Sequence, residues 1–260
     1  MSSTGVEPDF TKRFSNRVEY YIKYRPGYPR ELIDFLKENL GLCSASVIAD
    51  VGSGTGILSE MFLKNGNTVF GIEPNTEMRE AAEKLLAEYP GFKSINASAE
   101  ATTLDSESVD FVTAGQAFHW FELQQTRAEF ARILRPGGWT VIVWNSRRIG
   151  STPFLAAYES FLLAYGTDYR AVNQRRVSEK DWNQFFGAGG YRTKVFANAQ
   201  VFDYEGLKGR VLSSSYIPME GHPKYEPMIA GLEKIFHDNH TGGSVTFEYD
   251  TEIYYGRVRA

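Results

Sequence analysis

Apolar runs typical of strands alternate with helical patterns from residue 29 to residue 144, and this alternation is the feature that most narrows the possible folds. Five runs are typical of buried strands: 46–51, 67–74, 92–96, 108–114 and 139–144. Apolar spacing predicts helices at 29–40, 75–89 and 124–134, with a further helix through Leu58, Met61 and Phe62. Strands that alternate with helices form a parallel sheet covered on both faces. The predicted fold class is therefore α/β, with a doubly wound, mostly parallel sheet.

Two helix boundaries carry local end signals. Gly41 follows the last apolar residue of 29–40, and glycine readily adopts the left-handed conformation that closes many helices. Thr76 is predicted as the N-cap of 75–89, because its hydroxyl can accept a hydrogen bond from the first turn. Both boundaries place a loop directly beside a predicted strand.

The second half of the chain is less regular and rich in aromatic residues. Helices are expected at 153–165 and 225–236, and a strand or hairpin at 244–256. We therefore predict four regions: an N-terminal helical segment covering the ligand, a binding core, a late helical and aromatic lid insertion for substrate recognition, and final sheet strands. Their respective bounds are 1–45, 46–145, 146–243 and 244–260.

The glycine-rich segment Asp50–Gly56, written DVGSGTG, directly follows the first strand. Its glycine spacing departs from the dinucleotide fingerprint, and the Gly-Lys-Ser/Thr ending of a phosphate loop is absent. Glycines let a backbone pass close to a ligand, so the pattern favours a nucleoside with a short amino-acid tail. Glu73 ends the second strand, 23 residues after Asp50, where a carboxylate can accept hydrogen bonds from both ribose hydroxyls.

Several motifs in register resemble class I S-adenosylmethionine-dependent methyltransferases. They are DVGSGTG, GIEPNTEM, NASAEATTLDSESVDFV, QAFHWF and ILRPGGWTVIVW, and the resemblance covers residues 20–144. The YRPGYP and AFHWF segments look most like the small-molecule branch that includes trans-aconitate methyltransferase-like proteins. The resemblance implies S-adenosylmethionine as cofactor and S-adenosylhomocysteine as product.

The resemblance also implies a set of cofactor contacts. They are Tyr20, Arg25, Asp50, Gly52, Ser53, Gly54, Glu73, Pro74, Met78, Ser98, Ala99, Glu100, Gln116 and Ala117. Asp50 is also expected to fix the loop, Met78 fits ordinary core packing equally well, and Glu100 fits a solvated loop acid. Ser98 stands where many relatives have aspartate, and its hydroxyl accepts a hydrogen bond more weakly than a carboxylate would.

The segment after the fourth strand carries the candidate catalytic residue. His119 is interpreted as a general base or substrate partner, with a loop-holding hydrogen bond as the alternative. Candidate substrate contacts are Trp120, Tyr158, Arg170, Tyr216 and His222. His237 and His240 have no third ligand, so no metal site is expected.

The composition of the chain limits the classes of partner that we expect for this protein. A net charge of −4 disfavours a nucleic-acid partner, and no apolar run reaches the length of a membrane span, so no membrane partner is expected either. Cys43 is the only cysteine, which fits a reducing, cytoplasmic compartment.

We predict in-line methyl transfer to a small organic carboxylate or hydroxyl. The alternatives are a non-catalytic cofactor-binding regulatory module and a nicotinamide-dependent oxidoreductase, which the glycine spacing disfavours. The oligomeric state stays open.

Overall fold

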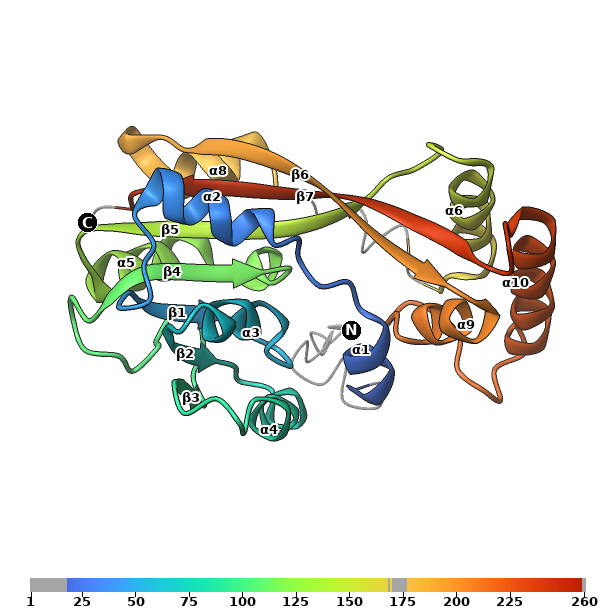
Figure 1. Cartoon of the computed structure of the whole chain (residues 1–260), viewed down its shortest axis with the longest axis horizontal. Coiled ribbons are helices and arrows are strands. Elements are labelled where there is room, and N and C mark those ends of the chain that lie inside the picture. Colours follow the sequence, from blue (N-terminus) through green and yellow to red (C-terminus); the bar gives the residue numbers. More distant parts are fainter. Residues whose placement is uncertain (1–17, 168, 170–176, 259–260) are drawn as a thin grey trace, which may run out of the picture.

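The computed structural model describes residues 18–167, 169 and 177–258, and its centre is one seven-stranded sheet (Figure 1). The strands are β1 Val47–Val51, β2 Thr68–Ile72, β3 Phe92–Ile95, β4 Val109–Gly115, β5 Leu134–Arg147, β6 Arg192–Phe202 and β7 Val245–Gly256. They lie in the order β3-β2-β1-β4-β5-β7-β6. The first five run parallel, and β7 pairs antiparallel with both β5 and β6. The predicted doubly wound, mostly parallel sheet is confirmed.

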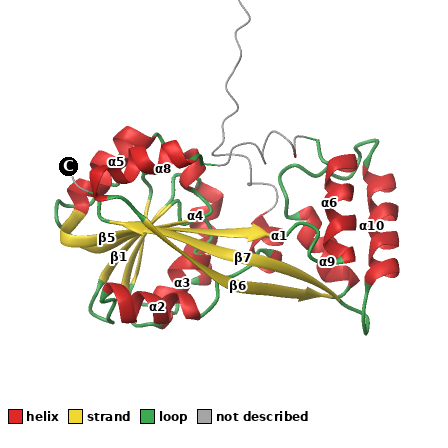
Figure 2. Cartoon of the chain, turned by 90° about the horizontal axis from the view of Figure 1, so that it is seen from above, coloured by secondary structure: helices red, strands yellow, loops and turns green. Residues whose placement is uncertain are grey.

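Helices cover both faces of this sheet (Figure 2). In the described residues the α-helices are α1 Val18–Tyr24, α2 Glu31–Leu40, α3 Ile57–Lys64, α4 Thr76–Leu85, α5 Leu123–Ile133, α6 Pro153–Tyr165, α8 Glu179–Phe186, α9 Tyr204–Leu212 and α10 Tyr225–Asn239. One core joins α2 and α3 to β-strand residues such as Ile48 and Val69. The other joins α5 and α8 to residues such as Ala49 and Val51. Neighbouring residues of β1 therefore face opposite cores, as the period of two requires.

The helix boundaries agree with the sequence at one position and differ at another. Gly41 closes α2 in the left-handed conformation, with φ of 77°, and its N–H donates to Leu36. The N-cap of α4 is Asn75 rather than Thr76, because the Asn75 side-chain oxygen accepts a hydrogen bond from the Met78 N–H. The prediction for Thr76 was therefore wrong by one residue.

Strand β5 contains the Pro136–Gly138 segment. Its pairing with β4 passes from Leu134 opposite Val109 to Trp139 opposite Phe111, so the extra residues are taken up as an irregularity within the strand. The segment 244–256, predicted as a strand or a hairpin, is the single strand β7. That long strand carries the sheet beyond the last β5 pair, Arg147 with Tyr249, as a two-stranded β6–β7 ribbon.

A separate helical unit packs on the projecting ribbon (Figure 2). Helices α6, α9 and α10 share a core with Phe247 and Tyr249 of β7. They fall in the range 146–243, together with β6, which is the sheet's edge strand, and α8, which packs on α5 in the main core. The range assigned to the lid thus supplies sheet and core elements as well as the helical unit. Among the described residues, no helix is both long and apolar enough to cross a membrane.

Replacing Asn75 by Ala is expected to lower the free energy of unfolding by about 1 kcal/mol, because the first turn of α4 loses its side-chain acceptor. The matched Thr76→Ala variant is expected to stay within about 0.5 kcal/mol of the wild-type protein. Urea unfolding of the three proteins measures both differences. A larger loss in Thr76→Ala than in Asn75→Ala would contradict the cap seen in the structure.

Candidate functional site

The loops after β1 and β4 face each other at the point where the strand order reverses. Strand β1 lies between β2 and β4 in the sheet. The connection after β1 leads to β2 on one side of β1, whereas the connection after β4 leads to β5 on the other side. Such a point leaves a crevice outside the carboxyl ends of the strands. Gly52 has a φ of 67°, and a Cβ there would lie 2.5 Å from the Ala117 Cβ. Only glycine therefore lets the two loops approach this closely.

The next residues of the glycine loop open toward the crevice. A Cβ on Gly54 would meet nothing within 4 Å. The Thr55 hydroxyl is buried and makes no hydrogen bond to the residues that the structure describes. A small cavity of about 30 Å³ lies beside them, and its lining includes Tyr28 and Gly115. A buried hydroxyl without a partner beside open backbone fits a ligand with polar atoms, since such groups are normally hydrogen-bonded.

Glu73, at the end of β2, holds the glycine loop. Its carboxylate accepts hydrogen bonds from the Gly54 N–H at 2.9 Å and from the Asn75 N–H at 2.9 Å. Burial raises the pKa of Glu73, and these two N–H groups oppose that shift. Each carboxylate oxygen can accept more than one hydrogen bond, so the side chain keeps acceptor capacity for a ligand hydroxyl.

Asp50 is completely buried beneath the loop and clamps three elements together. It accepts hydrogen bonds from Ser59 of α3 at 2.6 Å and from Thr113 of β4 at 3.1 Å. Burial raises the pKa of Asp50 to about 6. The carboxylate therefore fixes the floor of the crevice through the Ser59 and Thr113 hydroxyls.

The segment after β4 forms the opposite wall. Gln116 has a φ of 58°, a left-handed conformation that costs a non-glycine residue about 1 kcal/mol or more. Its side-chain amide donates to the Asn145 carbonyl of β5 at 3.1 Å, and its N–H donates to Val143. These two bonds hold the strained residue in place. Strain of this kind gathers at ligand sites.

A short 3₁₀ helix, η3 (Phe118–Trp120), places His119 on this wall. The His119 ring lies 4.4 Å from the Trp120 ring and 5.3 Å from the Trp144 ring, centroid to centroid. The ring of Trp182 of α8 stacks on the Phe118 ring with 4.8 Å between their centroids, and this contact holds η3 against α8. The histidine thus stands on a rigid, aromatic surface beside the crevice.

Comparisons with known proteins agree with this geometry. Residues 49–142 match a family model described as a methyltransferase domain. Residues 49–142 are thus similar to a methyltransferase domain. An uncharacterised methyltransferase of Mycobacterium tuberculosis is 37% identical over 139 residues, covering 54% of this chain and 54% of that protein.

Two further comparisons extend beyond the methyltransferase domain. An uncharacterised methyltransferase-like protein of Schizosaccharomyces pombe is 28% identical over 228 residues, 86% of each chain. The structure of a proposed type II methyltransferase from Anaeromyxobacter dehalogenans matches with a TM-score of 0.65 and 22% identity, covering 91% of this chain and 99% of that one. The matched region spans only about half the length of the mycobacterial relative. The structural match shows the fold.

The remaining predicted cofactor contacts of the methyltransferase domain surround the same edge. Pro74 is exposed after β2, and Met78 is buried in the first turn of α4. Ser98 and Ala99 lie in the loop after β3, where Ser98 forms a small bridge with Ala101. Glu100 accepts a hydrogen bond from the Glu122 N–H at 3.0 Å, which attaches its loop to the start of α5.

The predicted N-terminal contacts lie toward the helical unit. Tyr20 is exposed and stacks on Tyr24. Arg25 donates to the Ser213 carbonyl at 2.9 Å, just beyond α9. The α1 segment thus joins the methyltransferase domain to the helical unit.

The predicted substrate residues divide between two places. Trp120 stands on the crevice wall, whereas Tyr158 and Tyr216 belong to the helical unit. His222 is exposed, and its Nδ1 accepts a hydrogen bond from the Lys224 N–H in the turn before α10. Arg170 lies outside the described residues.

Sequence reasoning did not single out three residues that shape the crevice. Tyr28 lines the small cavity, and a Cβ on Gly115 would lie 2.5 Å from its hydroxyl. Thr55 supplies the buried hydroxyl that has no hydrogen-bond partner among the described residues, and the Asn145 carbonyl accepts the hydrogen bond from the Gln116 side chain. Tyr28 lies within the YRPGYP segment that carried the resemblance, so that motif was the available signal for it.

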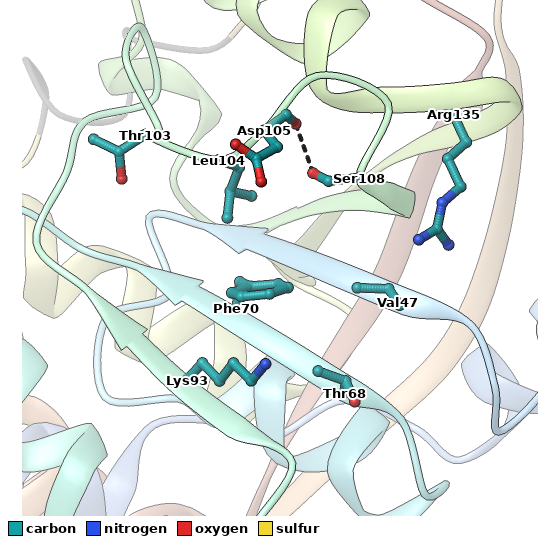
Figure 3. A pocket seen from close by; sticks show the side chains of 9 residues that line it. All are labelled: Val47, Thr68, Phe70, Lys93, Thr103, Leu104, Asp105, Ser108 and Arg135. Atoms are coloured by element: carbon teal, nitrogen blue, oxygen red, sulfur yellow. Dashed lines mark hydrogen bonds between the residues drawn. The ribbon is translucent and has the colours of Figure 1, made fainter.

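A larger pocket of about 420 Å³ lies at the opposite, amino-terminal edge of the sheet (Figure 3). Val47 and Thr68 begin β1 and β2, and both line it together with Lys93 and Arg135. The length of the strands separates this pocket from the glycine loop and the crevice. Ligands of open α/β sheets bind at the carboxyl edge, which favours the smaller site as the ligand site. The described residues contain no group of three or more side chains arranged to hold a metal ion.

Replacing Asp50 by Asn is expected to change the pH dependence of stability. Because the pKa of Asp50 is raised to about 6 in the folded state, protonation stabilises the fold, and that contribution is lost as the pH rises through 6. Between pH 4.5 and 7.5 the wild-type protein should lose about 2 kcal/mol relative to Asp50→Asn. Urea unfolding of both proteins at the two pH values measures this change. A gap that does not vary with pH would contradict a buried, ionisable Asp50.

Proposed function

We propose that this protein transfers the methyl group of S-adenosylmethionine to an oxygen of a small organic acceptor, with a carboxylate or hydroxyl favoured. The observation that carries the proposal is the crevice at the β1–β4 switch point, with open Gly54 backbone, an orphaned Thr55 hydroxyl and the acceptor oxygens of Glu73. These groups fit a nucleoside with an amino-acid tail. The acidic overall charge and the exposed thiol of Cys43 support a small-molecule acceptor and a cytoplasmic location.

Each side of the crevice has a separate part in binding. Glu73 would accept hydrogen bonds from the ribose hydroxyls, while the backbone from Gly52 to Gly54 lies against the methionine and ribose portions. Gln116 and Ala117 would bound the space beside the methyl group from the β4 side. Met78, Ser98 and Ala99 would contact the adenine.

The chemistry requires orientation more than activation. When bound, S-adenosylmethionine supplies a methyl group already activated by its positively charged sulfur. The acceptor would supply the oxygen that takes this methyl group, and S-adenosylhomocysteine would be the product. The protein's task is to hold the oxygen in line and exclude water. The aromatic wall of Trp120 and Trp144 beside His119 serves that exclusion.

The acceptor decides the role of His119. A carboxylate is ionised at neutral pH and needs only orientation, whereas a hydroxyl must lose a proton to a general base. The helical unit stands beyond the carboxyl edge of the sheet (Figure 2), where it can cover an acceptor as a lid. A purely regulatory binding module would share the cofactor groups, and detectable turnover distinguishes the two.

Calorimetric titration with S-adenosylhomocysteine tests the cofactor site. We expect binding to the wild-type protein and at least tenfold weaker binding to Glu73→Ala, because hydrogen bonds to a charged acceptor are lost. Glu77→Ala, an exposed acid on the first turn of α4, is the matched control and should bind as the wild type does. No binding of S-adenosylhomocysteine, or tighter binding of NADH, would refute the proposal.

His119→Ala separates the acceptor classes. With a carboxylate acceptor, the rate should fall less than about tenfold and stay independent of pH above pH 6, because no proton is removed. With a hydroxyl acceptor, the loss of a base should cost about 10²- to 10⁴-fold. Initial rates with radiolabelled cofactor between pH 6 and 9 measure both. A large loss with a carboxylate acceptor would contradict the orientation-only mechanism.

A further inference from the structure

The side chain of Asn145 in β5 is the centre of a buried hydrogen-bond network. It is 8% exposed. Its Oδ1 accepts hydrogen bonds from the Thr251 hydroxyl of β7 at 2.5 Å and from the Asn198 amide of β6 at 3.2 Å. Its Nδ2 donates to the Gly27 carbonyl at 3.0 Å, and the Asn198 amide donates to the same carbonyl at 2.8 Å. Asparagines from two strands therefore hold one carbonyl in the link between α1 and α2.

Asparagine suits this place because its amide carries both an acceptor and donors. An amide oxygen can accept two hydrogen bonds, and the Asn145 Oδ1 accepts one from Thr251 and one from Asn198. These bonds fix the plane of the amide, so that its Nδ2 is directed at Gly27. A carboxylate of the same shape could not donate to that carbonyl. A buried network whose members are satisfied holds its parts in one arrangement.

The Gly27 carbonyl controls the position of Tyr28. This carbonyl belongs to the planar peptide unit that joins Gly27 to Tyr28. Pro26 and Pro29 flank the pair, and each proline ring restricts its own φ angle. The link therefore has little conformational freedom once its carbonyl is held, and the Tyr28 side chain is held with it.

Tyr28 lines the small cavity of the crevice, together with Gly52 and Gly54 of the glycine loop. Gly115, at the end of β4, leaves room for the Tyr28 hydroxyl, because a Cβ on Gly115 would lie 2.5 Å from that oxygen. A phenolic hydroxyl can both donate and accept a hydrogen bond. Tyr28 thus brings a polar group to the loop that would lie against the methionine and ribose portions of the cofactor.

Asn145 contacts the two sides of the crevice through different groups. Its backbone carbonyl accepts the hydrogen bond from the strained Gln116, and a residue of any type at this position has such a carbonyl. Its side-chain amide supplies the hydrogen bond to Gly27. A substitution at position 145 therefore removes the connection to Tyr28 and leaves the acceptor for Gln116 in place.

We propose that Asn145 is a positioning residue for the cofactor site, which acts by holding Tyr28 against the glycine loop. This inference rests on the proposed function, because it concerns the site in which S-adenosylmethionine would bind. Asn145 is not among the described residues that line the small cavity, so it acts through Tyr28. Its side chain sets where the Tyr28 hydroxyl lies, and that hydroxyl forms a hydrogen bond with the bound cofactor.

The test is calorimetric titration of variants with S-adenosylhomocysteine. Asn145→Ala and Tyr28→Phe should each bind it about three- to tenfold more weakly than the wild-type protein, which is the range for one lost hydrogen bond. Asn67→Ala is the matched control. Asn67 is also buried, and its Nδ2 donates to the Cys43 and Ser46 carbonyls at the amino-terminal edge of the sheet. This variant should lose stability in urea unfolding, as Asn145→Ala does, and still bind S-adenosylhomocysteine as the wild type does.

A double variant separates positioning from a merely structural role. Because Asn145 acts through Tyr28, the protein with both substitutions should bind S-adenosylhomocysteine no more than about twofold more weakly than the weaker-binding single variant. Independent effects would instead multiply, to a loss of about 10- to 100-fold. If Asn145→Ala does not fold, Asn198→Ala, which removes the second donor to Gly27, takes its place in the same comparison.

Three results would overturn the inference. They are wild-type affinity in either single variant, losses that multiply in the double variant, and an equal loss of affinity in Asn67→Ala. Failure of the wild-type protein to bind S-adenosylhomocysteine at all would instead refute the proposed function, so the two failures are distinguishable.

Discussion

The candidate site depends on the hydrogen bonds that the buried Asp50 carboxylate accepts. Through Ser59 and Thr113 it joins β1 to the helix that follows it and to the neighbouring strand β4. Those elements carry the two loops of the crevice. Once they are fixed, Gly52 meets Ala117 closely and Gly54 is left facing open space. A ligand site thus follows from one charged group that the fold keeps out of water.

The long strands β5, β6 and β7 give the molecule its second part. Their continuation beyond the compact sheet supports a helical unit with its own core, and the α1 segment ties that unit back through Arg25. The region that carries the glycine loop would position the methyl donor, and the helical unit stands beyond the carboxyl edge of the sheet, where it would cover an acceptor.

The sequence predicted the strand and helix alternation well, because buried parallel strands are continuous apolar runs. It did not reveal β6, since the edge strand Arg192–Phe202 is mostly exposed and lacks such a run. Thr76 and Asn75 are both good capping residues, and only the backbone conformation decides between them. The motifs placed Glu73 and the glycine loop, whereas Thr55 and Asn145 have no local signal because their places at the crevice follow from the packed fold.

A crystal structure with S-adenosylhomocysteine tests the central claim most directly. The account predicts the nucleoside between the loops after β1 and β4, with both ribose hydroxyls on Glu73 and the sulfur near Gln116 and His119. Binding in the pocket at the amino-terminal edge, beside Lys93 and Arg135, would contradict it.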